Sequence, residues 1–60
     1  MTAQELTTAA LAARQAYIDA ANQAARGERG APDTKRLAQL AAEAARLETS
    51  AKKQALREQS

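Results

Sequence analysis

Apolar residues recur at helical spacing in the first half of the chain. Small or apolar side chains follow one another in alternating steps of about four and three residues, at Leu6, Ala10, Ala13, Tyr17, Ala20 and Ala24. This heptad-like spacing predicts a long helix that packs against a second helix. Thr2 and Glu5 have the spacing of a capping box, which would start the helix at Ala3. Gly27 suits the left-handed position that follows a helix end. We therefore predict a helix over residues 3–26.

The second half of the chain repeats the pattern. Its apolar positions are Leu37, Leu40, Ala44, Leu47, Ala51 and Ala55. Pro32 suits the first position of a helix and Asp33 its first turn, so we predict a loop over residues 27–31 and a helix over residues 32–58. A loop this short makes two helices antiparallel neighbours. The predicted fold is all-α, a single domain over residues 1–60 that forms an antiparallel two-helix hairpin.

The first helix carries a second apolar line, formed by Leu11, Ile18 and Ala25. At about 100° per residue, this line lies roughly 100–120° around the helix from the first one. The two lines span an arc of roughly 200°, about twice the stripe of roughly 100° that one core contact uses. The second helix has only a weaker second line, at Ala38, Ala45, Thr49 and Leu56. We expect the hairpin to be completed by copies of itself, as in a four-helix bundle, or by a larger partner.

The composition supports the need for a partner. Of the 27 hydrophobic residues 18 are alanines, whose burial removes little apolar area from water. The nine larger side chains cannot easily offset a backbone entropy cost of roughly 1–2 kcal/mol per ordered residue. Scaffolds of this size depend on a disulfide, a metal or a partner, and nothing in the sequence points to the first two.

The predicted protein interface uses the larger residues of both helices. Its members are Leu6, Leu11, Arg14, Tyr17, Ile18, Leu37, Leu40 and Leu47. Tyr17 is the natural anchor, because it is the one aromatic side chain in an alanine seam. Arg14 lies on the apolar arc, and no acid of the first helix faces it. A carboxylate on another chain would explain its position, and so would an exposed gap in the bundle.

No combination of residues predicts catalysis. The chain has no Cys and no His, so it lacks thiolate chemistry, the commonest general base and the commonest metal ligands. Gly27 and Gly30 lie in a segment that is too short for a phosphate loop. We expect no enzymatic activity, no cofactor and no metal. No segment approaches the roughly 20 apolar residues that span a bilayer, and the N-terminus is unlike a signal peptide. We expect no membrane association and a cytoplasmic location, or a virion if the source is a phage.

A basic stripe on the second helix is the one candidate for ligand recognition. Its residues are Lys35, Arg46, Lys53 and Arg57, which would contact a nucleic-acid backbone. The alternative is a solvated face that charge keeps soluble. The net charge is only +2, and no aromatic residue interleaves with the basic ones for base stacking, which favours the second interpretation.

Two families share short stretches with this chain. The run Ala12-Ala13-Arg14-Gln15-Ala16-Tyr17-Ile18-Asp19 resembles the first helix of the lambda-type head–tail joining proteins of tailed phages. That family has a β-hairpin between its helices, for which residues 27–32 leave no room. The opening M-T-x-Q-E-x-T, at Met1, Thr2, Gln4, Glu5 and Thr7, resembles the Rop-type RNA-binding hairpin of plasmids. In that family the RNA contacts would fall on the first helix, where this chain has mostly alanine and glutamine. Both resemblances imply an assembly of short helices.

The leading functional hypothesis is therefore a non-catalytic assembly protein that acts by helix packing. The phage resemblance implies a small virion component, such as a head–tail connector or a protein bound to one. One alternative is a dimeric bundle that binds nucleic acid through the second helix. Another is a small inhibitor or antitoxin-like protein that binds an enzyme.

Overall fold

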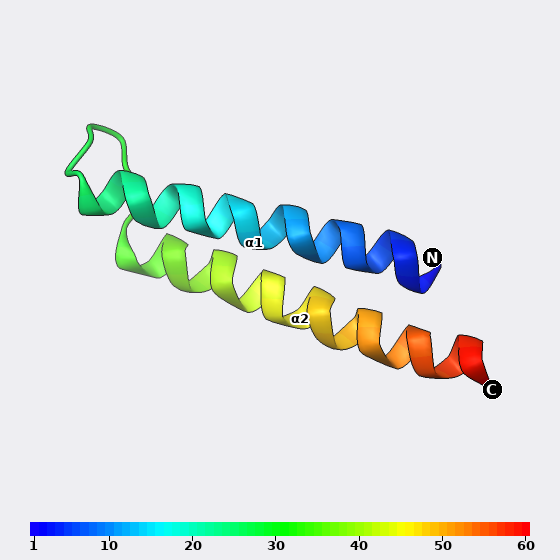
Figure 1. The fold of residues 1–60 in the computed structure, drawn as a ribbon. Helices are drawn as coiled ribbons and strands as arrows, with labels where there is room; N and C mark the ends of the chain where they lie inside the picture. The colour runs from blue at the N-terminus through cyan, green and yellow to red at the C-terminus, as the bar shows by residue number, and fades with distance from the viewer.

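The computed structural model describes all residues from 1 to 60 and has two helices. Helix α1 covers Ala3–Ala25 and helix α2 covers Thr34–Gln59. The helices run antiparallel and side by side, so that both termini lie at one end and the connecting loop at the other (Figure 1). The hairpin is elongated, with extents of 48 × 16 × 14 Å. The all-α antiparallel hairpin predicted from the sequence is confirmed.

Helix α1 begins with the predicted capping box. The Glu5 backbone N–H donates to the Thr2 hydroxyl at 3.1 Å, and the Thr2 backbone N–H donates to the Glu5 carboxylate at 3.1 Å. These bonds satisfy two donors that a helix start would otherwise leave without partners. The hydrogen bond from the Thr2 backbone, followed by that from its side chain, lowers the pKa of Glu5, because both favour the ionised carboxylate.

The loop begins with a Schellman motif. The Gly27 N–H donates to the Ala24 carbonyl at 3.1 Å, and the Glu28 N–H donates to the Gln23 carbonyl at 3.2 Å. Gly27 has φ +67°, which a residue with a Cβ adopts at a cost. The helix therefore ends at Ala25, one residue before the predicted bound, and residue 26 is its C-cap.

Helix α2 begins at Thr34, two residues later than predicted from Pro32. Asp33 is the N-cap, because its extended backbone lets the carboxylate accept the Arg36 N–H at 2.8 Å. Pro32 thus precedes the cap and is not the first helical residue. The helix continues to Gln59, one residue past the predicted end.

The two helices pack through the predicted apolar seams. All twelve seam positions are buried or half-buried, and the four fully buried residues are alanines, at positions 10, 20, 44 and 51. Ala3 donates its N–H to the Glu58 carboxylate at 2.7 Å, and Arg14 pairs with Glu48, which fixes the register. In this register each larger seam residue lies level with alanine on the other helix. Tyr17, for example, lies level with Ala44, which is only 3% exposed. Large side chains against small ones let the helices interdigitate closely.

Candidate interaction face

The second apolar lines of the two helices lie on the same side of the hairpin. A shallow groove shows this, because α1 contributes Thr7, Ala10 and Leu11 to it and α2 contributes Glu48, Ala51 and Lys52. Leu11 belongs to the second line of α1. Ala45 and Leu56 belong to the second line of α2, and Glu48 and Lys52 come from the stretch between them. Two antiparallel helices thus join their second lines into one surface.

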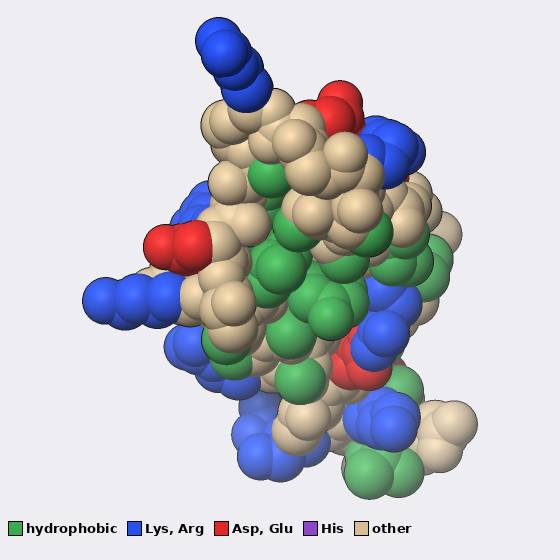
Figure 2. All heavy atoms as spheres, turned by 90° about the vertical axis from the view of Figure 1, so that its left-hand side faces the viewer, with side chains coloured by type: hydrophobic (Ala, Val, Ile, Leu, Met, Phe, Trp, Pro, Cys, Tyr) green, Lys and Arg blue, Asp and Glu red, His purple; other side chains and the backbone are tan.

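We call this surface the open face, and it consists of Leu11, Ile18, Ala25, Ala38, Ala45, Thr49 and Leu56. All seven residues are exposed. Leu11 is 65%, Ile18 41% and Leu56 66% exposed, so that three of the largest apolar side chains of the chain lie in water. Figure 2 looks along the hairpin from the loop end, and at that end hydrophobic side chains lie in the middle with Lys and Arg side chains around them.

The groove in the open face has a simple origin. It lies at the level where Ala10 of α1 meets Ala51 of α2, and no larger side chain is available at this level to fill the space. Leu11 forms one wall, and the aliphatic part of Lys52 can form the other. The groove is mostly apolar and open, which suits an apolar side chain from outside the hairpin.

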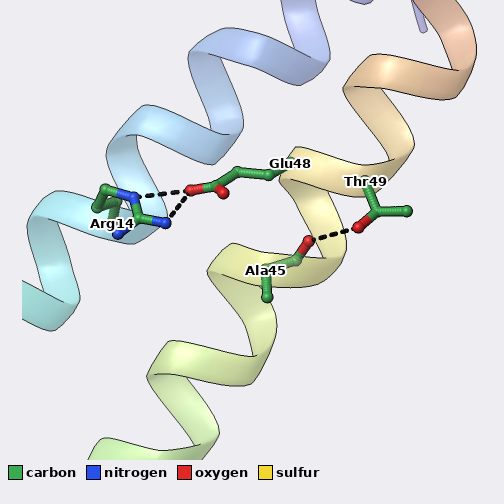
Figure 3. Close-up of polar contacts among 4 residues, drawn as sticks. All are labelled: Arg14, Ala45, Glu48 and Thr49. Atoms are coloured by element: carbon green, nitrogen blue, oxygen red, sulfur yellow. Dashed lines mark hydrogen bonds and ion pairs between the residues drawn. The ribbon is translucent and has the colours of Figure 1, made fainter.

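Arg14 and Glu48 cross the open face near the middle of the helices. The Arg14 Nε donates to Glu48 Oε1 at 2.7 Å, and the Nη2 of the same guanidinium donates to the same oxygen. Figure 3 shows the two side chains reaching toward each other from α1 and α2. Glu48 of the same chain is the partner of Arg14, so the position of Arg14 does not require the carboxylate of another chain that the sequence offered as one of two explanations. The pairing neutralises both charges on the face.

The predicted interface residues divide into three groups. Leu6, Tyr17, Leu37, Leu40 and Leu47 are half-buried in the seam and hold the hairpin together. Leu11 and Ile18 remain exposed on the open face, and Arg14 pairs with α2. Leu56 was not among the predicted interface residues, although it is about as exposed as Leu11. In the sequence Leu56 belongs to the weaker second apolar line of α2. That line forms a larger apolar surface only because the hairpin places it beside the second line of α1.

The basic stripe borders the open face on α2, because Lys35 and Lys53 lie three residues before Ala38 and Leu56. Lys35, Arg46, Lys53 and Arg57 are all exposed on the side of α2 that points away from α1. None of them forms an ion pair within the chain. The stripe also includes Gln39 and Glu43 beside Arg46, so that its charge is interrupted.

No group of three or more His, Cys, Asp or Glu side chains is placed to hold a metal ion. Neither helix combines the length and the apolar character needed to cross a membrane. Comparison with protein-family models, with curated proteins and with solved structures finds no match.

Proposed function

We propose that this chain is a non-catalytic assembly protein that acts by packing its open face against helices of another chain. The observation that carries the proposal is the exposure of Leu11, Ile18 and Leu56 on one side of a hairpin whose fully buried residues are all alanines. Exposed apolar side chains that share one face of a protein, unlike singly scattered ones, mark interaction sites.

The energetics of the isolated hairpin point the same way. No large side chain is completely buried, so the seam provides little of the apolar burial that offsets the entropy of ordering the chain. Long helices in proteins owe most of their stability to the packing of an apolar face. Covering the open face would add the burial that the hairpin lacks, which links assembly to folding.

The functional groups of the chain agree with a binding role. The polar side chains that the hairpin organises cap helices or bridge them, as Thr2, Asp33 and the Arg14–Glu48 pair do. No buried polar side chain is left without a partner. The open face therefore offers apolar packing, and the ion pair that crosses it is already neutralised within the chain.

The test is the helical content of the pure protein as it is diluted. We expect the circular dichroism signal of the helices to fall as the concentration drops from micromolar toward nanomolar, because an assembly dissociates and its hairpin then loses stability. A protein that is unfolded at every concentration and gains helix only with another protein would also fit the proposal. A fully helical, cooperatively folded monomer at all concentrations would contradict it.

A further inference from the structure

The chain uses its acidic groups internally and leaves most of its basic groups free. Six of the seven acidic side chains accept a hydrogen bond within the chain, in the two caps, the Arg14–Glu48 pair and three further contacts. Only two of the nine basic side chains, Arg14 and Arg26, form an ion pair. The surface therefore carries seven cations without a partner and one such acid, Glu43.

Three of the free cations border the open face. Lys52 lines the groove together with Leu11, and Lys35 and Lys53 border the second line of α2. All three lysines are exposed. Glu43, the one free acid, lies roughly 180° around α2 from Lys52 at about 100° per residue, so it belongs to another side of the helix. The open face is therefore an apolar surface with an uncompensated positive border.

The larger side chains of the open face are spaced like the contact positions of a helix. In the register of the hairpin, Leu56 lies level with a point about six residues before Leu11, and Ile18 follows Leu11 after seven. At about 1.5 Å per residue, the three side chains lie roughly 9 and 10 Å apart along the hairpin. A third helix that runs along this face presents a side chain to it about every seven residues, so it can meet all three.

The features of the open face favour a protein helix over other acidic partners. Nucleic-acid contacts of basic residues fall mainly on phosphates and sugars, which offer little apolar surface to Leu11, Ile18 or Leu56. A bilayer would bring the Arg14–Glu48 pair of the same face close to hydrocarbon, which is costly for charged groups. A protein helix can fill the groove with an apolar side chain and place polar side chains over the ion pair.

We propose that the open face binds a helix that carries acidic side chains beside an apolar stripe of heptad spacing. The apolar stripe packs on Leu56, Leu11 and Ile18, and the carboxylates meet Lys52 and Lys53. This inference rests on the proposed function and specifies the chemistry of the partner. Charge complementarity of this kind speeds association and selects among partners.

The test uses two synthetic helical peptides that share one leucine stripe at heptad spacing. The residues beside the stripe are glutamates in one peptide and lysines in the other, which favour a helix about equally. Fluorescence anisotropy of the labelled peptides measures their binding to the full chain. The glutamate peptide should bind about 10-fold tighter or more, and the ratio should shrink as salt rises from about 0.01 to 1 M, because salt screens surface charges.

Matched substitutions on α2 locate the charge effect. Lys52→Gln removes a cation at the groove, and Arg36→Gln removes one that lies roughly 160° around the helix from it. Both residues are exposed and outside any ion pair. Lys52→Gln should lower the affinity for the glutamate peptide about 3-fold, and Arg36→Gln should leave it unchanged. Lys52→Glu should improve binding of the lysine peptide, a reversal that a purely structural role of Lys52 would not produce.

Leu11→Glu tests the apolar centre of the same face. It removes a contact and places a carboxylate opposite an acidic partner, so the affinity for the glutamate peptide should fall about 30-fold or more. Ala12→Glu adds the same charge at an exposed position of α1 outside the open face and should have little effect. If Leu11→Glu does not fold, Leu11→Ala should still weaken binding about 10-fold, because alanine favours the helix at least as well as leucine.

The outcomes separate this inference from the proposed function. Equal affinity for the two peptides would overturn the inference and leave an assembly protein that recognises helices without regard to charge. Absence of binding by either peptide would also overturn the inference, and the helical content on dilution would decide the proposed function by itself.

Two further probes exclude plain charge attraction. A glutamate peptide of the same composition, with its leucines moved out of the stripe, should bind about 10-fold more weakly or worse. Equal binding by this peptide would overturn the inference. Tighter binding to phosphatidylglycerol vesicles or to duplex DNA than to the glutamate peptide would also overturn it, in favour of a lipid surface or a nucleic acid.

Discussion

The seam between the helices and the open face use apolar residues in opposite ways. In the seam the fully buried residues are alanines, and Tyr17 and the leucines each lie level with an alanine of the other helix. On the open face the larger residues Leu11, Ile18 and Leu56 project into water. Small residues let two backbones approach closely and complete their contact within the chain. Large exposed residues make no such contact within the chain, so their burial requires something outside it.

The same alanine-to-leucine substitution should have opposite effects in the seam and on the open face, and this is the largest difference that we expect. Ala44→Leu adds volume to the seam level with Tyr17, and overpacking of this kind costs about 1–3 kcal/mol of unfolding free energy. Ala45→Leu adds the same atoms to the open face, where they should leave the hairpin intact and preserve or strengthen association. Urea denaturation and sedimentation measure the two effects.

Ala42→Leu is the control, because this residue is exposed and lies outside both the seam and the open face. It should change neither stability nor association appreciably. A free energy of unfolding that Ala44→Leu lowers no more than Ala42→Leu does would show that the seam has room for a larger side chain.

The cap of α1 should affect the hairpin without touching the open face. Thr2→Ala removes the hydroxyl that accepts the Glu5 N–H, and such a loss costs about 1 kcal/mol of stability. Thermal unfolding at a fixed protein concentration measures it. Leu11→Glu should then weaken association by the same factor in the Thr2→Ala background as in the unchanged chain.

Acid should weaken the same cap. Because the folded pKa of Glu5 is lowered, ionised Glu5 contributes stability that is present above its unfolded pKa of about 4.3 and is lost as the pH falls through the folded pKa. NMR titration should give Glu5 a pKa below this value. Thr2→Ala should raise this pKa only in part, because the backbone N–H of residue 2 still donates to the carboxylate. A Glu5 pKa at its unfolded value in the unchanged chain would contradict the capping box.

The Arg14–Glu48 pair should contribute least. Its side chains are 52% and 37% exposed, and ion pairs in such settings contribute about 0–1 kcal/mol. A double-mutant cycle with Arg14→Ala and Glu48→Ala should therefore give a coupling below about 1 kcal/mol in the hairpin by itself, measured by urea denaturation. Association through the open face should raise this coupling, because the pair then lies in a drier interface.

The local signals in the sequence were sufficient to predict the hairpin. The seam spacing predicted both helices and the side of each that packs inward. Gly27 predicted the end of α1, and the Schellman bonds account for it. The start of α2 was misplaced at Pro32, because Pro32 and Asp33 both suit a helix start and only the hydrogen bond from Arg36 identifies Asp33 as the cap.

Two features depended on the fold. The partner of Arg14 is 34 residues away, and only the register of the antiparallel helices brings Glu48 opposite it. The second apolar line of α2 is short in the sequence and does not by itself predict an interface at Leu56. The hairpin places Leu56 on the same side as Leu11 and Ile18, where all three are exposed. The sequence by itself determined which residues are apolar on each helix, because helical periodicity is local. Only the tertiary structure decided that the two spare lines form one face, because that depends on the direction and register in which two helices meet.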